Sequence, residues 1–272
     1  MIRLICLEKT TLKEFTENNC AQASFFWYSL LKNKEIKVNG QKTGQNVTLE
    51  IGDEVCYYLT KKQEEKPAFY VVYEDENALI VDKESGVNSE AVFAALQRER
   101  ECYFIHRLDR NTRGLMAFAL NKRAEWELLN AFKERLAEKT YHALCFGCLP
   151  KEKDVLTAYL KKSAEKASVK IYDLPTAGAE QIVTEYETLE KSKEKTKIKV
   201  VLHTGKTHQI RAHLAHIGCP LVGDMKYGDE QKNKALNVAR QQLVAYSLKF
   251  NGLKELSAIN GREFLSRFDV EI

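Results

Sequence analysis

The sequence predicts an α+β fold, in which a mixed or antiparallel sheet with a few helices is preceded by a small N-terminal α+β domain. From residue 68 onward, short segments alternate apolar and polar residues as strands do, and only a few segments between them have helical spacing. A charged run at residues 61–67 ends in Pro67, which is typical of a linker. We therefore expect domains at residues 1–62 and 68–272, with a linker at 63–67.

The composition is that of an ordinary folded protein, with 272 residues of which 44% are hydrophobic and 29% charged. The longest apolar runs, at residues 25–31 and 115–120, are shorter than the roughly 20 residues of a membrane span. Residues 1–15 do not resemble a secretory signal, so we expect a cytoplasmic protein without a membrane partner. Seven scattered cysteines indicate reduced thiols, and the net charge of +4 is compatible with a polyanionic partner.

Helices are expected first in the N-terminal domain, followed by a small sheet. Residues 10–11 are suited to cap a short helix, and Ser24 a second helix that extends to Leu31. Residues 36–40 alternate into an Asn-Gly turn, and alternation returns over residues 47–58. This order of elements predicts a compact α+β module.

Strands dominate the second domain. We expect strands at residues 69–73, 79–82, 115–120, 140–146, 183–189 and 197–202, and helices at 90–98, 123–137 and 209–216. Trp27 and Trp126 lie at helical core spacing and are expected in the core. The lysine-rich stretch 191–197 is interpreted as a solvated hairpin loop.

Three segments combine charged side chains with glycine. They read IHRLDRNTRGL at residues 105–115, KTYHAL at 139–144 and LHTGKTHQIRAHL at 202–214. Each has a structural explanation when taken singly, because Asp109 fits a surface ion pair, Tyr141 a core aromatic and Arg211 a structural charge. Taken singly, most residues of these kinds are structural.

Taken together, the three segments resemble the RluA-type pseudouridine synthases. The signature of that family has an HRLDxxTxGL block, a KxY block and a TGRTHQIRxH block in this order. Residues 73–87 look like the family's opening strand and turn, so the resemblance extends over about residues 70–250. It implies the mixed-sheet catalytic domain of these enzymes, with no organic cofactor and no metal.

The resemblance also implies roles for individual residues. Asp109 matches the catalytic aspartate, which attacks a flipped uridine while the N1 glycosidic bond breaks and the base rejoins through C5. The resemblance leaves open whether the aspartate attacks the ribose or the base. Arg211 matches the cation that keeps this carboxylate ionised. Tyr141 would stack on the extruded uracil and assist removal of the C5 proton. Arg107 would fill the gap left by the base or bind its phosphate.

Further residues of the third block are expected near RNA. Lys206 and His208 are the RNA-binding candidates there, although the family usually has arginine at the position of Lys206, which gives a bidentate grip on phosphate. Arg113 stands where a serine is frequent. Asp224 and Tyr227 follow the block and are expected to support it through packing or hydrogen bonds.

Residues 1–62 resemble the alpha-L RNA-binding module first seen in small-subunit ribosomal protein four. Lysines outnumber the single acid, Glu35, over residues 32–42, and such clusters bind phosphates. The RNA-binding candidates of this module are Lys32, Lys34, Lys37 and Lys42. The other interpretation is a small appendage with a solvated basic face.

The sequence therefore predicts an isomerase that converts uridine to pseudouridine in structured RNA, with ribosomal RNA favoured over transfer RNA, and that acts as a monomer. The alternative is a non-catalytic RNA-binding or ribosome-assembly protein of the same fold. A phosphotransferase with an aspartate nucleophile is disfavoured, because no phosphate-cradling glycine loop or acidic magnesium site is present in the sequence. The lone C-x-x-C at 145–148, near His142, lacks a second ligand pair for zinc.

Overall fold

The computed structural model describes residues 1–163, 168–238 and 240–272. It divides into two compact units, of which the first comprises residues 1–110 and 116–125 and the second residues 111–115 and 126–272. Strand β10 (Arg113–Ala119) and helix α6 (Lys122–Lys133) each contribute residues to both units. The predicted linker at 63–67 lies inside the first unit and stays a prediction. Among the described helices, none is long and apolar enough to cross a membrane.

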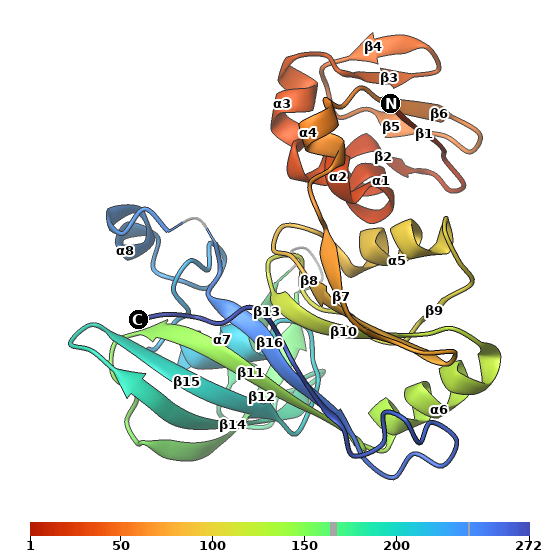
Figure 1. Cartoon of the computed structure of the whole chain (residues 1–272). Coiled ribbons are helices and arrows are strands. Elements are labelled where there is room, and N and C mark those ends of the chain that lie inside the picture. Colours follow the sequence, from red (N-terminus) through yellow and green to blue (C-terminus); the bar gives the residue numbers. More distant parts are fainter. Residues whose placement is uncertain (164–167, 239) are drawn as a thin grey trace. The chain divides into compact units, whose positions relative to one another are not determined.

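The N-terminal part of the first unit is a four-stranded antiparallel sheet with short helices (Figure 1). The strand order is β1 (Ile2–Ile5), β6 (Glu54–Tyr57), β3 (Ile36–Val38) and β4 (Gln41–Thr43). The helices are α1 (Leu12–Asn19), α2 (Ala21–Phe25), α3 (Trp27–Lys32) and α4 (Lys61–Glu64), and strands β2 (Thr10–Thr11) and β5 (Thr48–Leu49) form a separate pair. Trp27, Leu30, Ile36 and Tyr57 are among its core residues.

Local signals explain most of this part. The Thr11 side chain accepts the backbone N–H of Glu14 at 3.2 Å and caps α1, as predicted. Asn39 and Gly40 have φ angles of 49° and 80°, which the tight turn between β3 and β4 requires, so the predicted hairpin is confirmed. The prediction for Ser24 is wrong, because Ser24 lies inside α2 and the non-helical Phe26 divides the expected second helix into α2 and α3.

The rest of the first unit is built around strand β8 (Ala78–Lys83), which is buried along its whole length. It pairs with β7 (Phe69–Glu74) in antiparallel fashion and neighbours β10 on its other side. Strand β9 (Tyr103–Phe104) pairs with β10, and helix α5 (Ser89–Gln97) follows β8 along the chain. A strand buried on both faces gives the segments that flank Asp109 a rigid base.

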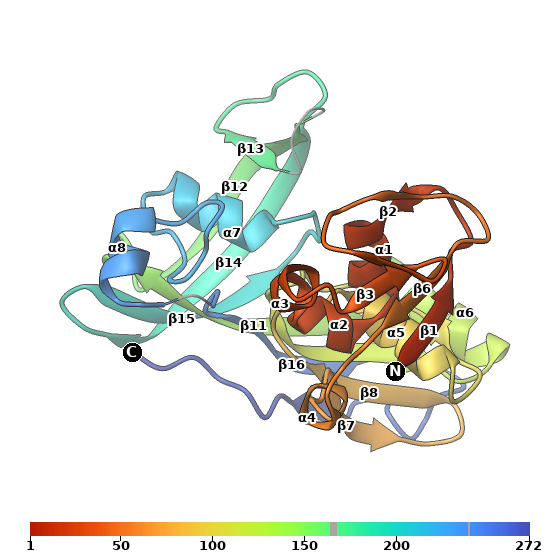
Figure 2. The same cartoon turned by 90° about the horizontal axis from the view of Figure 1, so that it is seen from above.

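The second unit contains a long sheet in which most neighbouring strands are antiparallel (Figures 1 and 2). Its order is β13 (Val169–Tyr172), β12 (Lys153–Lys162), β14 (Glu180–Lys191), β15 (Lys195–Leu202), β11 (Ala137–Phe146) and β16 (Leu243–Phe250). Strand β17 (Glu263–Leu265) pairs with β16, and the first residues of β10 run parallel to β16. Helix α7 (Gln209–His216) lies across one face, and α8 (Glu230–Ala235) follows it. The mixed sheet with interspersed helices confirms the α+β class. The predicted hairpin is present, but its loop is only residues 192–194; the ends of the 191–197 stretch belong to β14 and β15, and Thr196 is buried.

Helix α6 differs from the prediction, because Trp126 is 71% exposed rather than in the core. The buried face of the helix carries Leu128 and Ala131 instead. Glu127 lies on the same side, where its carboxylate accepts the backbone N–H groups of Lys254 and Glu255. These contacts turn Trp126 towards solvent, whereas Trp27 is buried as predicted. Each of the seven cysteines is a free thiol.

Candidate active site

Asp109 lies in an irregular segment of the first unit, between β9 and β10, and is half-buried. The preceding residue, Leu108, is held at both backbone polar groups by one side chain. Ser89 Oγ accepts the Leu108 N–H at 2.9 Å and donates to the Leu108 carbonyl at 2.9 Å. Ser89 is fully buried at the start of α5, so it fixes the backbone on one side of Asp109.

The residue that follows Asp109 is held as well. The carbonyl of Arg110 accepts the Gly86 N–H at 2.9 Å and the Lys83 ammonium at 3.1 Å. Lys83 ends β8, is fully buried, and also donates to the carbonyl of Val87 at 2.8 Å. Burial lowers the pKa of Lys83 to about 7, although the negative charge of Asp109 opposes this shift. Sequence reasoning missed Lys83 and Ser89; a lysine that ends an apolar strand was the available signal.

The end of the first block and the second block meet at strand β16 in the second unit. Gly114 pairs with Ala245 of β16, and Tyr141 of β11 pairs with the same residue from the other side. A Cβ atom on Gly114 would lie 2.3 Å from the Ala245 carbonyl oxygen, and the φ of Gly114 is +111°, so only glycine fits there. Tyr141 is buried. The two blocks therefore lie on the strands that flank β16 on either side.

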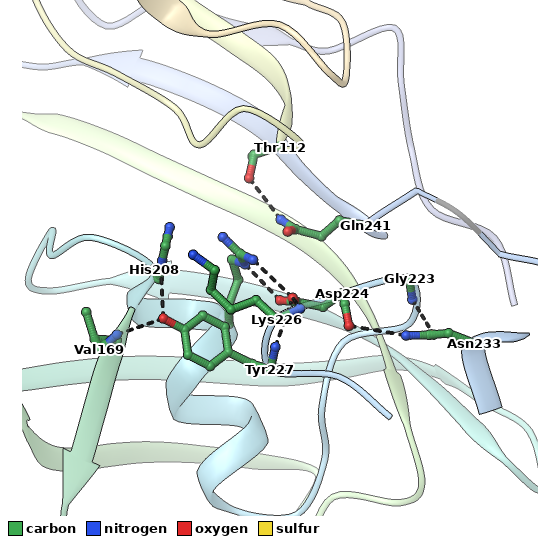
Figure 3. A network of polar contacts seen from close by, with 10 residues as sticks. Thr112, Val169, His208, Gly223, Asp224, Lys226, Tyr227, Asn233 and Gln241 are labelled. Atoms are coloured by element: carbon green, nitrogen blue, oxygen red, sulfur yellow. Dashed lines mark hydrogen bonds and ion pairs between the residues drawn. The ribbon is translucent and has the colours of Figure 1, made fainter. Parts of the chain in front are cut away.

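Arg211 of the third block forms a buried bidentate ion pair with Asp224, which is labelled in Figure 3. The Arg211 Nε donates to one carboxylate oxygen at 2.7 Å and Nη2 to the other at 3.0 Å. Burial alone would raise the pKa of Asp224, but Arg211 and the backbone N–H groups of Lys226 and Tyr227 hold it below its usual value. The expected support by Asp224 is confirmed as a set of hydrogen bonds.

His208 and Tyr227 extend this network (Figure 3). The Tyr227 hydroxyl accepts the Val169 N–H at 2.9 Å and lies 2.9 Å from His208 Nδ1. The Arg211 guanidinium lies over the Tyr227 ring, 5.2 Å from its centroid. His208 has a φ of 56° just before α7, which the contact with Tyr227 stabilises. Tyr227 therefore joins β13 to the start of α7, as expected of a supporting residue.

A further buried contact links the first block to the start of β16. Gln241 Nε2 donates to Thr112 Oγ1 at 3.1 Å, and both side chains are buried (Figure 3). Thr112 matches the threonine of the HRLDxxTxGL pattern, three residues after Asp109. The hydrogen bond gives this threonine a structural role inside the second unit.

Two predicted RNA-binding cations have carboxylate partners. Arg107 forms an exposed ion pair with Glu90 at 3.2 Å, and Lys206 pairs with Glu180. Surface pairs of this kind contribute about 0–1 kcal/mol, so a phosphate can replace the carboxylate at small cost.

The four N-terminal lysine candidates lie on or beside the β3–β4 hairpin. Lys32, Lys34 and Lys42 are exposed, while Lys37 is half-buried with its ammonium 5.2 Å from the centroid of the Tyr58 ring. Lys37 and Lys42 lie directly opposite each other in the hairpin. Like charges at opposed strand positions repel each other, and a bound polyanion would relieve this repulsion.

The candidates divide between the two units. The first unit contains Asp109, Arg107 and the four N-terminal lysines, and the second contains Tyr141, Arg211, Lys206 and His208. Within the part of the chain that the structure describes, no group of three His, Cys, Asp or Glu side chains is arranged to hold a metal ion.

Comparison with known families gives a match to the family described as RNA pseudouridylate synthase over residues 64–216, more than half of the chain. All three sequence blocks lie inside this range.

Named relatives are similar over most of the chain. Ribosomal large subunit pseudouridine synthase C of Rickettsia felis is 31% identical over 74% of this chain and 75% of its own. The protein of the same name from Vibrio cholerae is 30% identical over 75% and 72%, respectively.

Among solved structures, human RNA pseudouridylate synthase domain containing 1 has a TM-score of 0.60 with 27% identity, covering 67% of this chain and 78% of its own. Human RNA pseudouridylate synthase domain containing 4, at 19% identity and a TM-score of 0.59 over 72% of this chain and 87% of its own, has the same fold.

Proposed function

Because the chain belongs to the RNA pseudouridylate synthase family, we propose that it isomerises uridines of large-subunit ribosomal RNA to pseudouridine, as a monomer in the cytoplasm. The match over residues 64–216 carries this proposal, since it includes all three blocks with Asp109, Tyr141 and Arg211 intact. The relatives from Rickettsia felis and Vibrio cholerae are named for the large ribosomal subunit, which supports this RNA over transfer RNA.

In the proposed reaction, the carboxylate of Asp109 is the nucleophile. The N1–C1′ bond breaks, the uracil turns, and a C5–C1′ bond forms while the C5 hydrogen leaves as a proton and N1 gains one. Atoms balance without an oxidant, reductant or group donor. The clamped backbone of Leu108 and Arg110 supports this role, because a nucleophile must be held close to its reactive geometry.

Tyr141 and Arg211 complete the proposed catalytic set. A buried tyrosine on a strand offers a rigid ring for stacking on an extruded uracil, and its hydroxyl can take part in removal of the C5 proton. Arg211 is fixed by Asp224 and Tyr227, which supports its assignment as the preorganised cation of the site.

RNA binding is assigned to Arg107, Lys206 and His208 together with the N-terminal lysines Lys32, Lys34, Lys37 and Lys42. The opposed Lys37 and Lys42 support this assignment, since their repulsion disfavours the free hairpin. We expect affinity to fall steeply with salt, as phosphate contacts require.

The test is tritium release from RNA labelled at uridine C5, because formation of the C5–C1′ bond must expel that hydrogen. The substrates are large-subunit ribosomal RNA and transfer RNA from cells that lack this protein, assayed separately. We expect the wild type to release tritium from the ribosomal RNA and Asp109→Asn to release none, with RNA retention on filters unchanged.

Release from transfer RNA alone would overturn the substrate assignment. Full release by Asp109→Asn would overturn the nucleophile. RNA retention by the wild type without release from either RNA would favour the non-catalytic RNA-binding alternative.

A further inference from the structure

The C-terminal end of helix α1 contacts the segments that surround Asp109, within the first unit. Three consecutive residues of the helix take part. Glu17 forms an ion pair with Arg110, the Asn18 side chain accepts from Asn88 Nδ2 at 2.9 Å, and the Asn19 carbonyl accepts from Arg98. A cation at a helix C-terminus is favourable, because the last carbonyls carry partial negative charge.

Arg110 is the centre of these contacts. Besides its ion pair with Glu17, its Nε donates to the Gly86 carbonyl at 3.1 Å and its Nη2 to Ser24 Oγ at 3.4 Å. Ser24 is buried in α2, and the Glu17 side chain is mostly buried. A planar guanidinium holds several acceptors in fixed directions, so this cluster restrains the direction of the Arg110 side chain.

The same cluster adjoins the hydrogen bonds that hold the backbone of Leu108 and Arg110 on either side of Asp109, which we call the backbone clamps. Arg110 follows Asp109 directly, and its carbonyl is held by Gly86 and Lys83. Asn88, the partner of Asn18, precedes Ser89, which holds Leu108 at both backbone groups. Helix α1 therefore contacts a neighbour of each clamp.

We propose that the Glu17–Arg110 ion pair is a positioning contact, through which helix α1 holds Asp109 in its reactive conformation. The inference rests on the proposed function, since it requires Asp109 to be the nucleophile. It makes the N-terminal part of the chain, for which the sequence indicates only RNA binding, a determinant of the reaction rate as well. Small displacements of a reacting group can lower a rate about a hundredfold.

The sign of the charge at Glu17 separates this role from RNA binding. An acidic side chain repels phosphates, so its replacement by arginine cannot weaken RNA binding by removing a phosphate contact. A structural contribution of Glu17 to RNA affinity would therefore change the RNA concentration for half-maximal rate, whereas a contribution to catalysis would change the maximal rate.

The experiment compares Glu17→Arg with Glu14→Arg, which makes the same charge change one turn earlier on α1, where Glu14 is exposed. Tritium release is followed against the concentration of C5-labelled large-subunit ribosomal RNA. For Glu17→Arg we expect a maximal rate at least about tenfold below wild type, with no increase in the RNA concentration for half-maximal rate. Glu14→Arg and the conservative Glu17→Asp should stay within about threefold of wild type.

Hydrogen exchange supplies a readout that needs no activity. The Leu108 amide, which Ser89 protects, should exchange faster in Glu17→Arg and not in Glu14→Arg. A rate and a Leu108 exchange equal to those of Glu14→Arg would overturn the inference. A wild type that releases no tritium would overturn the proposed function and, with it, the rate effect. Unchanged exchange of the Leu108 amide in Glu17→Arg, together with normal tritium release by the wild type, would overturn only the positioning contact.

Discussion

The segment around Asp109 and the network around Arg211 are held in different ways. Asp109 is fixed indirectly, because the backbones of Leu108 and Arg110 are bound by Ser89 and Lys83. Arg211 is fixed directly, through two charged hydrogen bonds from its own guanidinium to Asp224. The first arrangement acts on the backbone on either side of Asp109, while the second acts on the side chain of Arg211 itself.

This difference has an energetic consequence. Removal of one member of a buried ion pair leaves an uncompensated charge, which costs about 3–5 kcal/mol. Loss of a neutral hydrogen-bond partner to a buried backbone group costs about 1–3 kcal/mol. We therefore expect changes in the Arg211 network to appear first as lost stability, and changes around Asp109 first as a lost rate.

The largest effect is expected for Asp224→Asn, which removes the negative charge that pairs with the buried Arg211 guanidinium. The free energy of unfolding should fall by about 3–5 kcal/mol, as measured by urea denaturation. Asp173→Asn is the control, because Asp173 is an exposed partner of His216 and its loss should cost no more than about 0.5 kcal/mol. Equal stabilities of the two variants would remove the contrast between the regions.

A second effect concerns pH and His213, which lies two residues after Arg211 on α7 and contacts Thr184 Oγ1 at 3.0 Å. Burial lowers the pKa of His213 to about 4 from 6.5. The unfolded chain therefore binds this proton more readily, and the free energy of unfolding should fall as pH drops from 6.5 towards 4, by up to about 3 kcal/mol.

Urea denaturation at pH 7 and pH 4.5 checks this sign. His213→Gln should lose less stability than the wild type over that interval, because the group that titrates is gone. The same loss in both proteins would show that His213 is protonated equally in the folded and unfolded states.

The smallest change in stability is expected for Ser89→Ala, which leaves both backbone groups of Leu108 without the Ser89 hydroxyl. We expect a cost of about 1–3 kcal/mol together with a lower maximal rate of tritium release at saturating RNA. Ser29→Ala on α3 removes an exposed hydroxyl that donates to the carbonyl of Phe26, three residues earlier in the chain, and serves as the control. A normal rate in Ser89→Ala would argue that the clamp does not position Asp109.

Much of the local structure was determined by the sequence alone. The Asn39-Gly40 hairpin, the Thr11 cap and the bounds of helix α7 follow from short-range sterics and hydrogen bonding, which neighbouring residues decide. The three blocks also indicated the family, and the comparison over residues 64–216 confirms it. The roles of Asp109, Tyr141 and Arg211 within that family stay predictions.

The tertiary structure decided what the side chains contact. Helical spacing placed Trp126 in the core, but the pairing of Glu127 with a distant backbone segment selected another face of α6. Likewise Glu17 and Arg110 are 93 residues apart in the sequence, and no local pattern marks them as partners. Backbone preferences act over a few neighbouring residues, whereas burial and charge pairing depend on which distant segments the folded chain brings into contact.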